Sequence, residues 1–110
     1  MIVREALLSI INYPVPESAI ENIVDSRTLG LNDEATPELR SRNNYRLAEA
    51  DVFMWVSFAP NIQEGGVNIN LLFSDRKELR EKANQIYREL NDPKQEPLIR
   101  QEFTYQGEEV

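Results

Sequence analysis

Cysteine and histidine are both absent from this sequence of 110 residues. A chain without cysteine forms no disulfide, binds no metal or iron–sulfur cluster through thiolates and offers no thiol nucleophile. A chain without histidine lacks the side chain that most often acts as a general base near neutral pH and most often binds metal ions. These absences predict a non-enzymatic protein with no catalytic residue, no metal site and no cofactor.

Glycine and positive charge are also scarce. The four glycines, Gly30, Gly65, Gly66 and Gly107, fit neither GxxxxGK[ST] nor GxGxxG, so the sequence contains neither phosphate-binding motif. Twelve lysines and arginines stand against nineteen aspartates and glutamates, a formal net charge of −7. Because cationic charge supplies most of the affinity for a nucleic-acid backbone, this balance argues against a nucleic-acid partner.

Long apolar runs are missing as well. The most apolar stretch, residues 52–59, is far too short to span a bilayer. Near the first residue, Arg4 and Glu5 interrupt the apolar run that a signal peptide requires. We therefore expect no membrane partner and a cytoplasmic location.

The remaining composition is ordinary for a soluble globular protein. Hydrophobic residues account for 41% and charged residues for 28% of a chain whose length matches one compact domain. The composition changes after Asn91, where two prolines, Pro93 and Pro97, precede several acidic residues. The sequence therefore predicts a single helical domain over residues 1–92 and a C-terminal extension over residues 93–110.

Apolar spacing predicts a mainly α fold with four helices. They cover about residues 3–11, 16–29, 37–59 and 74–90. The third helix has Thr36 as its expected N-cap, and Pro60 is expected to end it. Asp75, with Glu78 three residues later, has the spacing of a capping box, and Ser74 is the alternative cap for the last helix.

Residues 52–59, in the third of these helices, carry apolar side chains around nearly the whole circumference. A helix that is apolar all round is expected to be buried all round, so this segment is predicted to lie at the centre of the core. In so small a domain, a second subunit can instead complete its burial. Both alternatives stay open from the sequence.

A small β element is predicted over residues 67–73, where apolar and polar side chains alternate after the loop 61–66. A lone strand leaves its backbone N–H and C=O groups unpaired, so this strand needs a partner. The partner is either the segment 98–105 of the same chain or a strand of another subunit. The candidate interface residues are therefore Val67, Ile69, Leu71, Phe73, Ile99, Phe103 and Tyr105.

The only basic and aromatic cluster before the last helix consists of Arg40, Arg42, Arg46 and Tyr45. Such a cluster can contact a phosphate backbone, which makes a nucleic-acid-binding module one alternative for this chain. The net charge of −7 disfavours that alternative. A solvated face or a protein interface is the simpler interpretation of these arginines.

Residues 48–79, AEADVFMWVSFAPNIQEGGVNINLLFSDRKEL, together with Ala83, Ile86 and Tyr87, resemble a stretch of small tailed-phage and prophage proteins. In those proteins a long apolar helix is followed by a loop ending in glycine, a β-like segment and a Ser-Asp-Arg helix start. The resemblance covers about residues 45–90. The organisation of this uncharacterised family resembles that of head–tail connector (adaptor) proteins, which are mostly helical and form rings beneath the portal.

The resemblance implies a structural protein of a phage or prophage particle, most simply a ring-forming head–tail connector. The implied partners are other copies of the chain and portal or tail proteins, without a membrane, a specific nucleic acid or a small-molecule substrate. The implied location is the virion or the host cytoplasm. The alternative from the residues alone is a small cytoplasmic regulatory protein that acts through contact with another protein.

Overall fold

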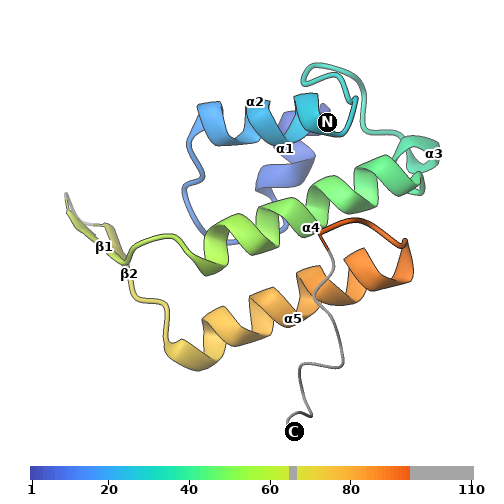
Figure 1. Cartoon of the computed structure of the whole chain (residues 1–110). Helices are drawn as coiled ribbons and strands as arrows, with labels where there is room; N and C mark the ends of the chain where they lie inside the picture. The colour runs from blue at the N-terminus through green and yellow to red at the C-terminus, as the bar shows by residue number, and fades with distance from the viewer. Residues whose placement is uncertain (65–66, 95–110) are drawn as a thin grey trace, which may run out of the picture.

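The computed structural model describes residues 1–64 and 67–94, with the backbone alone at residues 63, 64 and 67. The elements follow the order α1–α2–α3–α4–β1–β2–α5 (Figure 1). α4 is the central element, because α1, α2, α3 and α5 each contact it. α1 and α2 lie on one side of α4, and α5 runs along its other side (Figure 1).

The two short N-terminal helices are present, each a few residues shorter than predicted. α1 covers Val3–Leu8 and α2 covers Glu17–Ser26. The Ile2 N–H donates a hydrogen bond of 3.0 Å to the Glu5 carboxylate, and α1 therefore begins directly after Ile2. The Val3 N–H donates to the Asp33 carbonyl, which ties the start of the chain to the loop after α2.

The long helix predicted over residues 37–59 is divided into α3 (Pro37–Arg40) and α4 (Asn43–Ser57). The expected N-cap is confirmed, because Thr36 Oγ1 accepts a hydrogen bond of 3.2 Å from the Leu39 N–H. The Arg42 N–H donates to the Leu39 carbonyl, three residues back, and α4 starts anew from there. The prediction of one continuous helix is wrong because the Ser-Arg-Asn-Asn stretch offers side chains that compete for backbone hydrogen bonds.

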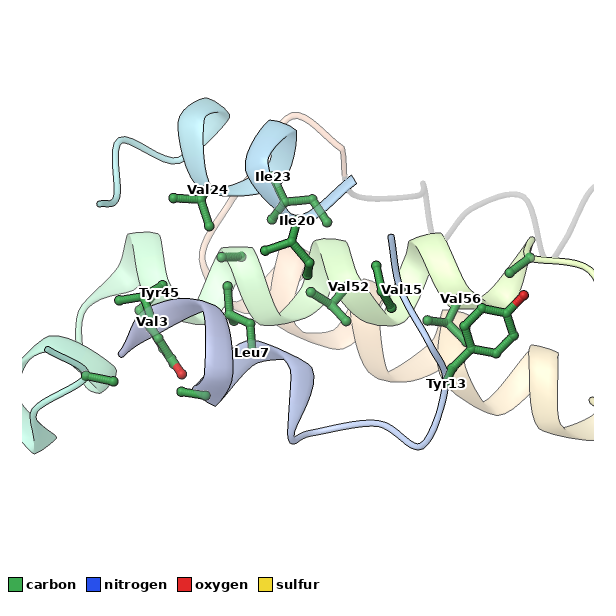
Figure 2. Close-up of a cluster of buried hydrophobic side chains, with 14 residues drawn as sticks. Val3, Leu7, Tyr13, Val15, Ile20, Ile23, Val24, Tyr45, Val52 and Val56 are labelled. Carbon is green, nitrogen blue, oxygen red and sulfur yellow. The ribbon is translucent and has the colours of Figure 1, made fainter. Parts of the chain in front are cut away.

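One face of α4 builds the main core with α1 and α2 (Figure 2). Its largest fully buried side chains are Val3, Leu7, Ile20, Val24, Tyr45, Val52 and Val56. A second apolar cluster lies between α4 and α5, where Ala50 packs with Ala83 and Tyr87. α4 is therefore buried on two faces.

The segment 52–59 is central, as predicted, but it is not buried all round. Val52, Val56 and Ala59 are buried, and Trp55 is half-buried. Phe58, at the C-cap of α4, is 71% exposed. The prediction of complete burial is wrong at Phe58, whose ring has the Arg80 guanidinium of the last helix over it and is otherwise too little covered to be buried.

The predicted strand is shorter than expected, and its partner is local. β1 (Ile62–Glu64) pairs antiparallel with β2 (Val67–Ile69), and the register joins Ile62 to Ile69. The prediction that residues 61–66 form only a loop is therefore wrong at β1. β2 pairs within its own chain, and the alternative partner 98–105 lies outside the described residues. The hairpin projects from the end of the helix pair (Figure 1).

α5 (Phe73–Glu89) begins earlier than predicted. The Asp75 carboxylate accepts a hydrogen bond of 3.0 Å from the Leu72 N–H, so Leu72 and not Ser74 or Asp75 is the N-cap. The second half of the predicted strand 67–73 is wrong for this reason, since its last residues belong to the helix and its cap.

The chain is thus mainly helical with a small β element, and the predicted fold class is confirmed. Four helices have more than one turn, and α3 adds a single turn before α4. Within residues 1–64 and 67–94, none of the helices has the length and apolar character needed to cross a membrane.

Candidate functional site

Three large apolar side chains at the end of α4 and the start of α5 are exposed. Phe58, at the C-cap of α4, is 71% exposed, and Leu72, the N-cap of α5, is 57% exposed. Phe73, the first residue of α5, is 78% exposed. We call these three residues the apolar end. Large exposed apolar side chains that lie together are typical of contact surfaces for other proteins.

The hairpin is fixed to this end of the molecule by polar contacts. Arg76 of α5 donates to the backbone carbonyls of Ser57 and Ala59, and so caps the last turn of α4. It also donates to Asn61 Oδ1 at 3.0 Å, and the same oxygen accepts the Leu71 N–H at 2.8 Å. The base of the hairpin is therefore held against both helices.

The interface residues predicted from sequence divide into four groups. Ile69 and Leu71 are half-buried and pack against the main core, so their side chains face their own subunit. Phe73 is exposed at the apolar end. Val67 lies in β2 beside the turn, and its side chain is not described. Three further candidates lie outside the described residues, namely Ile99, Phe103 and Tyr105.

Two members of the apolar end, Phe58 and Leu72, were not among the predicted interface residues. Phe58 lies in the segment 52–59, for which the sequence left core and subunit interface open, because the sequence does not show which turn of a helix lacks a neighbour. The hairpin itself had a usable signal. Gly65 and Gly66 separate two short stretches by two residues, a spacing typical of a β-hairpin.

A buried ionic cluster joins α2, α4 and the end of α5. Arg27 donates two hydrogen bonds to the Asp51 carboxylate, at 2.7 and 2.9 Å, and one to Asp92 at 2.8 Å. Tyr87 donates its hydroxyl to Asp51 at 2.6 Å, and Lys94 Nζ lies 3.2 Å from Asp51. Asp51 is only 5% exposed, so its charge is compensated entirely by these partners. A sequence signal existed, because Asp51 is the one charged residue in residues 50–59.

The cluster changes the proton affinity of its members. Burial, followed by the hydrogen bond to Asp51, raises the pKa of Tyr87 well above its ordinary value. The hydrogen bond from Arg27 lowers the pKa of Asp92. The hydrogen bond to Asp51 raises the pKa of Arg27, so the guanidinium stays charged at every accessible pH. These shifts favour the charged forms of Arg27 and Asp92 and the neutral form of Tyr87 near neutral pH.

A groove of about 540 Å³ adjoins this cluster. Its apolar walls come from α2 and α4, through Ile23, Met54, Trp55 and Phe58. Two cations stand at its border, Arg80 from α5 and Lys94 after α5. The Arg80 guanidinium lies over the Phe58 ring, 5.3 Å from its centre. The groove therefore suits an apolar ligand segment that carries negative charge.

The arginine cluster considered as a nucleic-acid contact is engaged within the chain. Arg46 pairs with Glu89 of α5 at 3.0 Å, and Arg40 Nε donates to the Ala35 carbonyl at 2.9 Å. Arg42 is exposed at the N-cap of α4. In residues 1–64 and 67–94, three or more acidic side chains do not converge anywhere in a geometry that could hold a metal ion.

The shifted pKa values predict how stability depends on pH. The pKa of Asp92 is lower in the folded state, so its contribution is present above about pH 4 and is lost as pH falls further. The pKa of Tyr87 is higher in the folded state, so its contribution is present below about pH 10 and is lost as pH rises beyond that value. Denaturant titrations between pH 2.5 and 11 can be followed through Trp55 emission. The free energy of unfolding should be constant around neutral pH and should fall at both acidic and alkaline pH.

Matched variants identify the groups responsible for the loss of stability at acidic pH (the acidic limb) and at alkaline pH (the alkaline limb). Asp92→Asn should flatten the acidic limb, and Tyr87→Phe should reduce the alkaline limb. Burial also raises the pKa of Tyr45, so part of the alkaline limb should persist in Tyr87→Phe. An alkaline limb of unchanged size in Tyr87→Phe would contradict the role of the cluster.

Comparison with known proteins produced no relative of this chain. Neither the scan against protein-family models nor the searches of curated proteins and of solved structures gave a match. The resemblance to tailed-phage and prophage proteins therefore stays a prediction from the sequence.

Proposed function

We propose that this chain is a non-enzymatic structural protein of a phage or prophage particle, a ring-forming head–tail connector. In this proposal its partners are other copies of itself together with portal or tail proteins, and it acts in the virion or in the host cytoplasm during assembly. The observation that carries the proposal is the apolar end beside the projecting hairpin (Figure 1).

The apolar end supports the proposal through its energetics. Phe58, Leu72 and Phe73 are each more than half exposed, and burying aromatic side chains is a main source of affinity at protein interfaces. The hairpin adds backbone N–H and C=O groups to this candidate contact surface. Among the described residues β1 pairs only with β2, so each strand has an outer edge that a strand from another chain can join.

The arrangement of the elements supports a head-to-tail contact. The hairpin lies at the end of α4 whose C-cap is Phe58, and α3 lies at the other end (Figure 1). A contact between two different surfaces of identical subunits produces a ring when the rotation between neighbours closes. A connector ring requires contacts of this heterologous kind.

The variant Phe73→Asp is expected to reduce association with the portal at least tenfold. Loss of an aromatic anchor at an interface commonly costs about 2 kcal/mol or more, and 1.4 kcal/mol corresponds to tenfold. Phe73 is the first residue of α5, where an aspartate interacts favourably with the helix dipole, so the fold should be retained. The measurement is cosedimentation with a portal protein encoded in the same prophage region, together with the yield of completed particles.

Gln85→Asp is the matched control, because it places the same charge at an exposed position further along α5. It should associate like the wild type. Equal association of Phe73→Asp and the control would refute the apolar end as the contact surface. If the wild-type protein associates with no portal or tail component, the connector proposal fails and a regulatory protein acting through another partner becomes the better interpretation.

A further inference from the structure

The groove beside the buried ionic cluster is large and apolar for a chain of this size. Its volume of about 540 Å³ lies in the range of pockets that hold a ligand. Trp55 and Phe58 both line it, and Phe58 is 71% exposed. Filling the groove would therefore remove aromatic surface from water, which is favourable in proportion to the area buried.

We propose that the C-terminal segment of the same chain, residues 95–110, occupies this groove. The segment starts directly after a residue that lines the groove. Lys94 itself lines the groove and is held there, with its Nζ 3.2 Å from Asp51 Oδ1 and its N–H donating to Asp92 at 3.1 Å. The last described residue, Lys94, therefore lies at the groove, and a segment tethered to it binds at a high effective concentration.

The segment beyond Lys94 is also long enough to extend along the whole groove. The groove extends along α4 from Asp51 to Phe58, which is about 10 Å at a rise of 1.5 Å per residue. An extended chain advances about 3.3 Å per residue, so three residues span about 10 Å, and the four or five residues beyond Lys94 reach past the full length of the groove. Leu98 and Ile99 are the residues at that spacing, and they are the first large apolar residues after Lys94. Pro97 favours an extended conformation in the residue before it.

The charge of the segment also suits the groove. Residues 95–110 contain four glutamates and one arginine, and the groove is lined by Arg80 and by the paired charges of Lys94 and Asp51. Arg80 has no carboxylate partner within 4 Å among residues 1–62 and 68–94, whose side chains the structure describes. An acidic segment with apolar residues near its start therefore matches both the walls and the border of the groove. Phe58 belongs both to the apolar end and to the groove, so occupation of the groove would leave Leu72 and Phe73 for the contact with another protein.

Trp55 is the only tryptophan of the chain, so its emission reports on the groove directly. In the full-length protein, the double variant Leu98→Asp/Ile99→Asp should shift Trp55 emission to longer wavelength and raise its acrylamide quenching constant about twofold. The control Gln106→Asp/Val110→Asp adds the same charge to the same segment beyond the predicted contact, and should behave like the wild type. Far-UV circular dichroism establishes that each variant is folded.

A second measurement does not depend on a disruptive variant. Because the chain has no cysteine, a nitroxide can be attached at a single introduced site. Ile99→Cys carrying the label should quench Trp55 strongly at low micromolar concentration, and Val110→Cys should quench it weakly. Equal and weak quenching from both sites would overturn the proposal, as would unchanged Trp55 emission in Leu98→Asp/Ile99→Asp. Quenching that appears only as protein concentration rises, together with a dimer in sedimentation, would overturn it in favour of docking between two copies.

Discussion

Asp51→Asn is expected to lower the free energy of unfolding by about 3–5 kcal/mol, the usual cost of removing one member of a buried ion pair. The carboxylate of Asp51 accepts from Arg27, Tyr87 and Lys94, and it is 5% exposed. An asparagine of the same shape presents an NH₂ group toward these donors and loses the negative charge. Since small domains have about 5–15 kcal/mol of stability in total, urea unfolding should show a large loss.

Asp25→Asn is the matched control for this variant. Asp25 is an exposed residue of α2, so the same chemical change there should alter the unfolding free energy by no more than about 0.5 kcal/mol. If Asp51→Asn proves as mild as Asp25→Asn, the ionic cluster does not stabilise the fold. Wild-type stability in Asp51→Asn would also mean that the contacts joining residues 92–94 to the helical domain contribute no stability.

Leu7→Ala is expected to destabilise the protein by about 2–5 kcal/mol. The Leu7 side chain is fully buried at 0% exposure, where α1 packs against α2 and α4 (Figure 2). Alanine leaves a cavity in a closely packed region, and the cost depends on how far the neighbours collapse into it. The measurement is again urea unfolding followed by Trp55 emission and circular dichroism.

Leu72→Ala makes the same chemical change at the apolar end. Leu72 is 57% exposed, so we expect a loss of less than about 1 kcal/mol in the isolated protein. A similar loss at both leucines would mean that the apolar end is part of the core of the free subunit, which would also weaken the proposal that it binds another protein.

The helices were predictable because their signals are local. Spacing of apolar residues placed α1, α2 and α5 to within a few residues, and the helix predicted over 37–59 proved to be α3 and α4. The cap at Thr36 was identified from three neighbouring residues. Their ends were less accurate. The Asp75 carboxylate bonds to the Leu72 N–H, and this choice between adjacent backbone groups is decided by the path of the chain leaving the hairpin.

Side-chain environments were harder to predict than elements. Phe58 and Val56 lie two residues apart in an equally apolar stretch, yet one is 71% exposed and the other is fully buried. The difference depends on which neighbouring helix covers each side of α4. Arg27 and Asp51 are 24 residues apart, and nothing in either local sequence indicates that they pair.

By itself, then, the sequence determined the mainly helical class, the small β element and the exclusion of cysteine and histidine chemistry, because periodicity and composition act locally. The tertiary structure alone decided that β2 pairs with β1, that Arg27, Asp51, Tyr87 and Asp92 form one buried cluster, and that Phe58 and Phe73 are left exposed. These features arise from contacts between residues distant in sequence, whose energies depend on packing and desolvation and not on local propensity.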